Sequence, residues 1–588
     1  LRRLEYRGYD SAGVATLENG HLTRRRAEGK LRNLGERLVR EPLGGHSGIG
    51  HTRWATHGRP NETNAHPHAN DRVAVVHNGI IENFRELRDG LRAKGHRFDT
   101  ETDTEVIAHL VAEEMKGRNS AVEAVAAALP KLRGAFALAF LFEGETDLLI
   151  GARRGSPLAV GWGEGQMYLG SDALALAPFT QDITYLDEGD WVVLHRSGAE
   201  FHDASGAIVE RARIRTQASA FLVDKGEHRH FMAKEIHEQP EVVGRTLAHY
   251  LDMSGGKVAL PFELPFDAKA LNRVTLTACG TAYYAGLIAR YWFERFARLP
   301  VDIDVASEFR YREAPMQGDG LAIVISQSGE TADTLASLRY AKGERQHILS
   351  VVNVPTSTIA RESELVAPTL AGPEIGVAST KAFTCQLSVL ACLAIALGRA
   401  RGVLGAEDEA RLVNELIAVP GLIADALKQE GEIEKIAHGL ANAKSALYLG
   451  RGGSFPLALE GALKLKEISY IHAEGYAAGE LKHGPIALID EDMPVIVIAP
   501  KDPWLEKTVS NVQEVAARGG RIILIGDEEA RNELATDLDG AALLKPMASD
   551  FSAIVYAIPV QLLAYHAAVF MGKDVDQPRN LAKSVTVE

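Results

Sequence analysis

The second half of the chain repeats one local pattern, and this repeat is the strongest constraint on its fold. A strand-like segment that enters a glycine turn, residues 272–280, recurs as residues 444–450. Each copy continues with a helical stretch and two apolar strands separated by a helix: 322–325 and 348–352, then 495–499 and 522–525. Strands that alternate with helices predict parallel sheets flanked by helices. We therefore expect two copies of one α/β unit.

A polar turn follows the strand at 322–325. It spans residues 326–331, reads Ser-Gln-Ser-Gly-Glu-Thr, and leads into a helix expected over 332–340. Backbone N–H groups and the positive end of a helix dipole bind phosphate at such turns, and the hydroxyls of Ser326, Ser328 and Thr331 would add donors. Taken alone, the turn fits an ordinary strand-to-helix connection about as well as a phosphate site. Ligands of parallel sheets bind at the carboxyl ends of strands, where this turn falls.

The first 215 residues have a different pattern. Strand-like segments at 73–77, 135–142 and 191–195 surround helical patterns near 82–94 and 103–116, which predicts mixed α and β structure with hairpin-like strands. Residues 216–240 begin polar and irregular and become helical at 232, which favours a linker. The expected divisions are a first domain at 1–215, the linker at 216–240, further domains at 241–405 and 406–570, and a tail at 571–588.

Composition argues against several functional classes. Lys and Arg number 64 and Asp and Glu 78, a net charge of −14, so neither nucleic acid nor an anionic membrane is expected as a partner. The longest apolar run, 387–397, is too short to span a bilayer, and the first residues have no apolar signal core. We therefore expect a cytoplasmic protein without membrane contact.

No motif predicts a metal, a disulfide framework or a nucleotide cofactor. Cysteine occurs three times without Cys-x-x-Cys spacing, which favours structural thiols. Two His-x-His pairs lack a suitable third ligand nearby, so surface loops are the better interpretation. The glycines of 450–453 lack the Gly-x-Gly-x-x-Gly spacing of a dinucleotide site. We expect neither a metal nor a cofactor.

Several motifs occur together in an order that points to a known family. They are residues 5–13, 51–58 (His-Thr-Arg-Trp-Ala-Thr-His-Gly), 77–79 (His-Asn-Gly), 326–331, 376–381 (Gly-Val-Ala-Ser-Thr-Lys), 480–485 (Glu-Leu-Lys-His-Gly-Pro) and the tail 576–588. The whole chain resembles the glucosamine-6-phosphate synthase family, and its second half resembles paired sugar isomerase (SIS) domains. The resemblance implies an N-terminal-nucleophile-type αββα glutaminase fold followed by two SIS α/β domains with parallel sheets.

The resemblance assigns roles to residues of the first domain. Amide hydrolysis passes through an oxyanion that needs preorganised N–H donors, here the side chain of Asn78 and the backbone of Gly79. Arg53 would bind the α-carboxylate of glutamine and Asp103 its α-ammonium group. The remaining pocket residues implied by the resemblance are Trp54, Thr56 and His57.

One departure from the family pattern concerns the nucleophile. The family uses an N-terminal cysteine whose α-amine acts as the base, whereas this chain begins with Leu1 and its three cysteines lie in the second half. We therefore expect that a short segment before Leu1 is missing, either because the molecule is N-terminally truncated or because the sequence as given omits it. As written, such a chain would depend on free ammonia or act only as an isomerase.

The resemblance also assigns the sugar-phosphate site. The residues implied to hold the phosphate and sugar are Thr281, Ser326, Gln327, Ser328, Thr331, Val377, Ala378 and Ser379. Ala282 stands where a serine is common in the family. Lys583 of the tail would form an imine with C2 of the opened ketose. Because an ammonium is not a nucleophile, we expect the site to bury this lysine or to place it beside other cations.

Three further residues complete the implied catalytic set. Glu467 would move a proton between C1 and C2, and Lys464 lies one helical turn before it on the same face. A solvent-exposed salt pair is the ordinary interpretation of that spacing. His483 would open the sugar ring, since an imidazole can give and take a proton near neutral pH. In the family this histidine comes from a second subunit, which implies a homodimer.

Two functions of different class follow. The first is an enzyme that transfers the amide nitrogen of glutamine to fructose 6-phosphate and isomerises the product to glucosamine 6-phosphate, at the start of UDP-N-acetylglucosamine synthesis. The second is a binding protein that senses a sugar phosphate without turnover. A sensor has no use for an imine-forming lysine or a proton-moving carboxylate, so Lys583 and Glu467 favour the enzyme.

Overall fold

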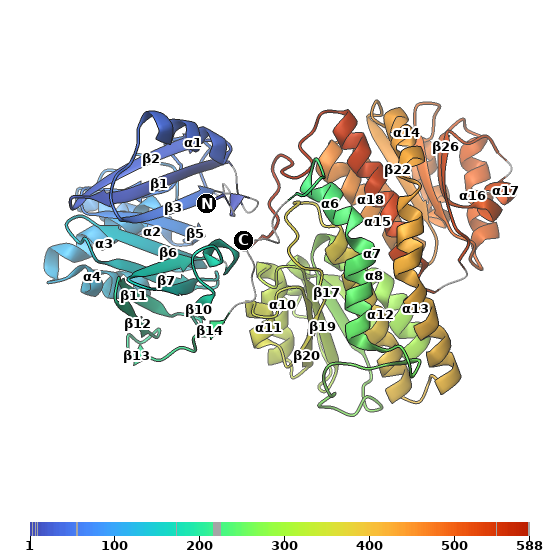
Figure 1. Cartoon of the computed structure of the whole chain (residues 1–588), viewed down its shortest axis with the longest axis horizontal. Helices are drawn as coiled ribbons and strands as arrows, with labels where there is room; N and C mark the ends of the chain where they lie inside the picture. The colour runs from blue at the N-terminus through green and yellow to red at the C-terminus, as the bar shows by residue number, and fades with distance from the viewer. Residues whose placement is uncertain are drawn as a thin grey trace. The chain divides into compact units, whose positions relative to one another are not determined.

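The chain forms two compact units in the computed structural model, Leu1–Val223 with Ser584–Glu588 (unit 1) and Asp224–Lys583 (unit 2). The structure describes all residues except 3, 6, 7, 9, 54–56, 172, 216–224, 535, 548–549 and 586–588, and the side chains of 173–174. Figure 1 shows the course of the chain through both units, which are considered separately.

Unit 1 is built from antiparallel sheets and short helices. Its strands are β1 (Ser11–Glu18), β2 (His21–Glu28), β3 (Ser47–Arg53), β4 (His68–Ala69), β5 (Val73–Gly79), β6 (Phe136–Phe142), β7 (Leu149–Arg154), β8 (Ala159–Gly163), β9 (Gln166–Gly170), β10 (Asp182–Tyr185), β11 (Trp191–His195), β12 (Gly198–His202), β13 (Ile208–Val209) and β14 (Ile214–Arg215). Its helices are α1 (Leu31–Arg40), α2 (Phe84–Ala93), α3 (Glu105–Glu114), η2 (Met115–Gly117), α4 (Ala121–Ala128), η3 (Leu129–Lys131) and α5 (Ala173–Leu176). The strands and helices expected in this region are therefore present.

The layers of unit 1 follow from which faces of its sheets are apolar. Helix α1 packs through Leu34 on the sheet β2-β1-β3. That sheet packs through Ile49 on the seven-stranded sheet β13-β12-β11-β7-β6-β5-β4. Helices α3 and α4 cover the opposite face of the larger sheet, where Val106 and Val125 join Phe140 in one core cluster. This helix–sheet–sheet–helix order confirms the αββα expectation.

Unit 2 contains two parallel sheets of the same topology. Their strand orders are β18-β17-β19-β20-β21 and β23-β22-β24-β25-β26, so both follow the order 2-1-3-4-5 in chain sequence. The strands are β17 (Val274–Ala278), β18 (Val301–Val305), β19 (Leu321–Ser326), β20 (His347–Val352), β21 (Leu365–Pro368), β22 (Ser445–Gly450), β23 (His472–Ala477), β24 (Pro494–Ala499), β25 (Arg521–Asp527) and β26 (Gly540–Leu544), besides a small hairpin of β15 (Leu251–Asp252) and β16 (Lys257–Val258). The repeat expected from the sequence is confirmed.

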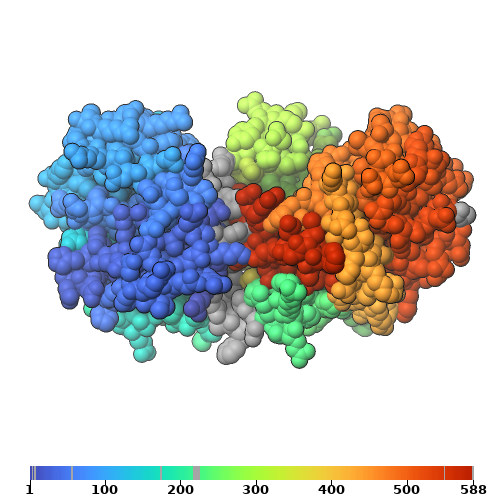
Figure 2. All heavy atoms as spheres, turned by 90° about the horizontal axis from the view of Figure 1, so that it is seen from above, coloured from blue at the N-terminus to red at the C-terminus, as the bar shows by residue number. Residues whose placement is uncertain are grey.

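Helices cover both sheets and join them through one core. They are α6 (Phe231–His237), α7 (Gln239–Tyr250), α8 (Gly280–Trp292), η5 (Phe293–Ala297), α9 (Ala306–Phe309), α10 (Ala332–Gly343), α11 (Thr358–Glu362), α12 (Lys381–Ala400), α13 (Ala406–Leu427), α14 (Glu430–Leu440), α15 (Ser454–Ser469), η6 (Ala478–His483), η7 (Pro485–Leu488), α16 (Leu505–Ala516), α17 (Glu528–Leu534) and α18 (Ser552–Phe570). Leu276 of the first sheet and Tyr448 of the second belong to the same buried cluster. In the space-filling view, the end of the chain (dark red) lies between the green-to-yellow first lobe and the orange second lobe (Figure 2).

Two helices of unit 2 are long and apolar enough to cross a membrane by length and composition, α12 and α18. Inside the protein, 94% of the apolar window of α12 and 83% of that of α18 are buried. Such burial is the behaviour of core helices in soluble proteins. The apolar run 387–397 of the sequence lies within α12.

Candidate functional site

The polar turn 326–331 lies at the carboxyl end of β19, between that strand and α10. Ser326 Oγ lies 3.0 Å from Thr331 Oγ1 and accepts the N–H of Gly329 at 3.0 Å, so the turn closes on itself. Ser328 Oγ accepts the N–H of Glu330 at 3.2 Å. The first sheet changes direction between β17 and β19, which is where ligands of this topology bind. The turn therefore stands where a phosphate site is expected.

Gly329 is needed for the shape of this turn. Its φ is +66°, and a Cβ at this position would lie 1.9 Å from the hydroxyl oxygen of Ser357. Ser357 is the N-cap of α11 and accepts the N–H of Ala360. Only glycine allows the turn and the start of α11 to approach this closely.

Thr281, in the first turn of α8, connects the first sheet to the second lobe. It is 9% exposed, and its hydroxyl donates to Glu460 Oε1 of α15 at 3.2 Å. The carboxyl end of β17 is thus joined to the helix that carries the expected proton-transfer residues.

Helix α15 carries three ionisable side chains on one buried face. Lys464 Nζ lies 2.6 Å from Glu467 Oε2 and 3.5 Å from Glu460 Oε1. The lysine and Glu460 side chains have no exposed surface, and Glu467 is 20% exposed. The Lys464–Glu467 pair therefore joins a fully buried lysine to a carboxylate that is one-fifth exposed, unlike the solvent-exposed salt pair that the spacing alone would predict.

The pKa values of Glu460 and Lys464 are both shifted from their ordinary values. Burial raises the pKa of Glu460 to about 8, although Lys464 partly offsets the effect, so Glu460 carries a proton at neutral pH. Burial would lower the pKa of Lys464, but Glu460 and Glu467 outweigh it and raise that pKa. Lys464 lies closer to Glu467 than to Glu460.

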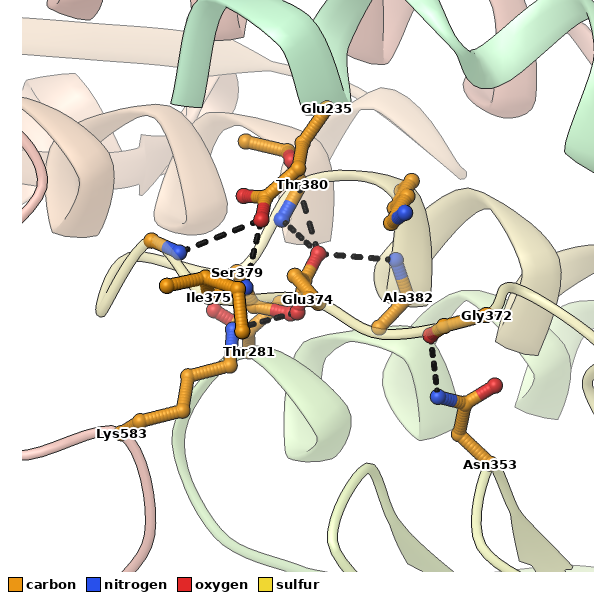
Figure 3. Close-up of polar contacts among 12 residues, drawn as sticks. Glu235, Thr281, Asn353, Gly372, Glu374, Ile375, Ser379, Thr380, Ala382 and Lys583 are labelled. Carbon is orange, nitrogen blue, oxygen red and sulfur yellow. Dashed lines mark hydrogen bonds and ion pairs between the residues drawn. The ribbon is translucent and has the colours of Figure 1, made fainter. Parts of the chain in front are cut away.

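Lys583 is buried by the docking of the tail. Its side chain is 3% exposed and its ammonium group forms an ion pair with Glu374, whose side chain has no exposed surface (Figure 3). The expectation that the site buries this lysine is confirmed. Its partner, however, is a carboxylate rather than another cation.

Glu374 accepts hydrogen bonds from five donors among the described residues, one of them the hydroxyl of Thr380 at 3.4 Å from its Oε1. Its Oε1 accepts the N–H groups of Thr380 at 2.8 Å and Ala382 at 3.1 Å, and its Oε2 accepts the hydroxyl of Ser379 at 2.8 Å as well as Lys583. Burial disfavours its ionisation, but Lys583 and these hydrogen bonds outweigh burial and lower the pKa of Glu374 to about 2. It is a permanent anion that joins the tail to the start of α12.

The expected sugar-contacting residues belong to the loop that Glu374 begins. Val377 is 9% exposed and Ala378 1%, and the Val377 N–H donates to the carbonyl of Asp576 in the tail at 3.1 Å. Gln327, in the polar turn, accepts the N–H of Asn353 through its carbonyl at 3.3 Å. The polar turn and the loop therefore both belong to the first lobe, and the tail contacts the loop through Asp576.

His483 does not join this group within one chain. It ends η6 of the second lobe and is exposed. No hydrogen bond of its ring is found among the residues that the structure describes. Its role stays a prediction.

In unit 1, Asn78 and Gly79 end β5. A Cβ on Gly79 would lie 2.0 Å from the carbonyl oxygen of Ala135, and its φ is +147°, so no other residue fits there. Asp103 is 3% exposed, and its Oδ2 accepts the N–H of Ile81 at 2.8 Å just beyond that strand. The aspartate is thereby fixed beside the expected oxyanion donors.

Arg53 ends β3 and is 3% exposed. Its guanidinium donates to the carbonyls of His57, Gly58 at 3.2 Å and Arg59 at 3.3 Å, so it braces the loop that follows. Burial lowers the pKa of Arg53, with Asp10 and Asp103 opposing the shift. His57 lies in this loop, whereas Trp54 and Thr56 lie outside the described residues.

Sequence reasoning missed two carboxyls of the isomerase site. Glu460 lies four residues before Lys464, so helical spacing could have revealed it. Glu374 carried no local signal, because Lys583 is 209 residues away in sequence. Among the described residues, no group of three or more His, Cys, Asp or Glu side chains is arranged to hold a metal ion.

Family models match all three expected blocks. A model described as a glutamine amidotransferase domain matches residues 51–178. A model described as a SIS domain matches residues 269–396 and 439–571. Each SIS match contains one of the two parallel sheets.

Full-length relatives and a solved structure are also similar. The chain is 68% identical over 588 residues to a glutamine–fructose-6-phosphate aminotransferase (isomerizing) of Bradyrhizobium diazoefficiens and 65% identical to a protein of the same name from Brucella suis. Both matches take in 100% of this chain and 97% of the relative, so they do not support our expectation of a truncated chain. The C-terminal domain of glucosamine-fructose-6-phosphate aminotransferase from Francisella tularensis is 44% identical, with a TM-score of 0.58, and covers 60% of this chain and 100% of its own.

The buried lysine of α15 provides a test of the site's stability. Replacing Lys464→Met leaves Glu467 without its cation in a buried position, and we expect a loss of about 3 kcal/mol in the stability of unit 2. Lys466→Met, at an exposed position of the same helix, should change stability by less than about 0.5 kcal/mol. Thermal and denaturant unfolding of the two variants measure the difference. Equal stability would contradict the buried pair.

Glu460 provides a test by pH. Because its pKa is raised in the folded protein, the folded state holds a proton that the unfolded state releases, and stability falls as pH rises from the ordinary 4.5 toward about 8. Glu460→Gln keeps the neutral shape and should remove this part of the slope. Unfolding curves across that range measure it. A variant with the slope of the parent protein would show that Glu460 is ionised throughout.

Proposed function

The chain belongs to the family of isomerizing glutamine–fructose-6-phosphate aminotransferases, and we propose that it moves the amide nitrogen of glutamine onto fructose 6-phosphate, giving glucosamine 6-phosphate and glutamate. The observation that carries this proposal is the buried Lys583–Glu374 pair beside the loop 375–379. An amine held at the carboxyl edge of a SIS sheet suits imine chemistry on a ketose phosphate. We propose the domain divisions 1–215, 241–405 and 406–570, with the linker 216–240 and the tail 571–588.

Phosphate binding is assigned to the turn after β19. The hydroxyls of Ser326, Ser328 and Thr331 and the N–H groups of the turn can donate to phosphate oxygens, and α10 adds the favourable end of its dipole. Gln327 and Thr281 complete this side of the pocket. Val377, Ala378 and Ser379 contact the sugar hydroxyls from the opposing loop.

The amine of Lys583 adds to C2 of the open-chain ketose, and loss of water leaves the imine. Ammonia then adds to C2 and the lysine departs. The Lys583 ammonium group, paired with Glu374, must release a proton before its nitrogen can attack C2.

Isomerisation then moves a proton from C1 to C2. We assign this step to Glu467, the one-fifth-exposed carboxylate of the α15 group, with Lys464 holding its orientation. His483 opens the sugar ring.

The exposure of His483 in one chain supports a homodimer in which it enters the site of a second copy. A two-fold arrangement is the commonest symmetry for such an exchange. We also propose a cytoplasmic location, where both substrates are expected and where the three free thiols stay reduced.

Glutamine is assigned to unit 1. The Asn78 side chain and Gly79 N–H form the oxyanion site, and Asp103 binds the α-ammonium group. Arg53 binds the α-carboxylate, together with His57, Trp54 and Thr56 in the same pocket. The Arg53 guanidinium also donates to three carbonyls of the following loop. Arg53 therefore fixes the geometry of that loop as well.

The imine is tested by reduction. Borohydride with fructose 6-phosphate should give a covalent adduct by intact mass, and Lys583→Ala should abolish both the adduct and ammonia-supported product formation. Lys573→Ala, a tail lysine that lies over the ring of Tyr470 instead, is the matched control and should keep both. If sugar phosphate binds but no adduct forms in the parent chain, the non-catalytic sensor is the better function.

The glutamine site can be tested by comparing product formation with glutamine and with ammonia as the nitrogen source. Asp103→Asn removes the negative charge that faces the α-ammonium group of glutamine. Because a charge-assisted hydrogen bond is lost, product formation with glutamine should fall by about 10-fold or more. Ammonia-supported formation should stay unchanged. Asp71→Asn, at an exposed position of the same unit, is the control. Equal losses with both nitrogen sources would contradict this assignment.

A further inference from the structure

Helix α6 presents a buried acid to the loop that precedes α12. Glu235 is 2% exposed, and its Oε1 accepts the N–H groups of Ile375 at 2.5 Å and Gly376 at 3.2 Å. Its Oε2 is buried and has no hydrogen-bond partner among the described residues. Burying a carboxyl group whose second oxygen has no hydrogen-bond partner costs free energy. The two N–H groups accepted by Oε1 therefore do not by themselves account for a glutamate at this position.

The two ends of the sugar-contacting loop are held by two different acids. Glu235 binds its first residues, Ile375 and Gly376, whereas Glu374 binds Ser379 and Thr380 at its end. In the close-up, both carboxyl groups lie against this loop, and Lys583 approaches Glu374 from the other side (Figure 3). The backbone of 375–379 is therefore fixed at both ends.

Gly376 allows this approach. A Cβ there would lie 2.8 Å from Glu235 Oε2 and 3.5 Å from the Cα of Met232. Helix and loop are thus in direct contact, with the orphan oxygen at the point of closest approach. A movement of Glu235 is transmitted to the loop without an intervening layer of side chains.

The charged groups around Glu235 differ in sign. Burial, and then the charge of Glu374, raise the pKa of Glu235 to about 8, while Lys583 and Lys381 oppose the shift. Lys381 is itself paired with Glu238 of the turn after α6 at 2.7 Å. At neutral pH Glu235 is therefore an uncharged acid, and Lys583 faces the single negative charge of Glu374.

We propose that Glu235 is a positioning residue of the isomerase reaction, which holds the loop 375–379 against the sugar and leaves Glu374 as the carboxylate that Lys583 faces. This inference rests on the proposed function, because it presumes that Lys583 forms the imine. Ionised Glu235 would place two carboxylates around the lysine, favour its ammonium form and slow the attack on C2.

Two substitutions separate the parts of this role. Glu235→Gln keeps an oxygen for both N–H groups but cannot ionise, whereas Glu235→Ala removes the acceptor. Glu241→Gln, at an exposed position of the neighbouring helix α7, is the matched control. The measurements on the full chain are the rate of borohydride-trapped adduct with fructose 6-phosphate across the range around about pH 8, and KM for the sugar phosphate with ammonia as nitrogen source.

In the parent chain and in Glu241→Gln, we expect the trapping rate to decline as pH rises through about 8, and in Glu235→Gln we expect this decline to be absent. Glu235→Ala should raise KM by about 10-fold, since two buried N–H groups lose their acceptor, while Glu235→Gln keeps KM within about 2-fold at neutral pH. A merely structural residue would not move the pH profile of trapping.

The inference is overturned if Glu235→Gln declines with pH as the parent does, or if Glu235→Ala folds and keeps the parent KM. If Glu235→Ala does not fold, the pH dependence of the trapping rate in Glu235→Gln tests the inference instead. Absence of any adduct in the parent chain would instead overturn the proposed function, so the two failures are distinguishable.

Discussion

The ion pair between Glu374 and Lys583 is the contact on which the isomerase site depends. One carboxylate binds the tail lysine, the hydroxyl of Ser379 and the first N–H groups of α12. Tail, loop and core helix are thus ordered by a single anion. Because the pair is fully buried, removing either partner would leave an uncompensated charge in the interior. The docked tail therefore supplies the cation that pairs with Glu374.

The two lobes share a topology but contribute different elements to the proposed site. The first sheet ends in the polar turn 326–331, whereas the equivalent strand β24 of the second ends in Pro-Lys-Asp-Pro at 500–503. The second lobe instead supplies α15, whose buried face meets Thr281 of the first. A duplicated fold can specialise in this way because function resides in loops and helix faces, while the sheets supply the common core.

The sequence predicted the fold further than it predicted the site. Strand and helix alternation gave two parallel sheets, because buried parallel strands are continuous apolar runs such as β19. The carboxyl groups were harder to find: Glu374 meets Lys583 over 209 residues, and Glu235 meets Gly376 over 141. No local spacing encodes such contacts. Family motifs identified the lysine, and its predicted burial is confirmed, but they did not identify Glu374, the carboxylate that pairs with it.

Each of the two buried lysines, Lys583 and Lys464, lies beside two acidic side chains. Beside Lys583 the pKa of Glu374 is lowered and that of Glu235 is raised, and beside Lys464 the pKa of Glu460 is raised while Glu467 forms the shorter ion pair. Each lysine thus has one counter-charge within a low-dielectric core, which avoids the repulsion of two anions.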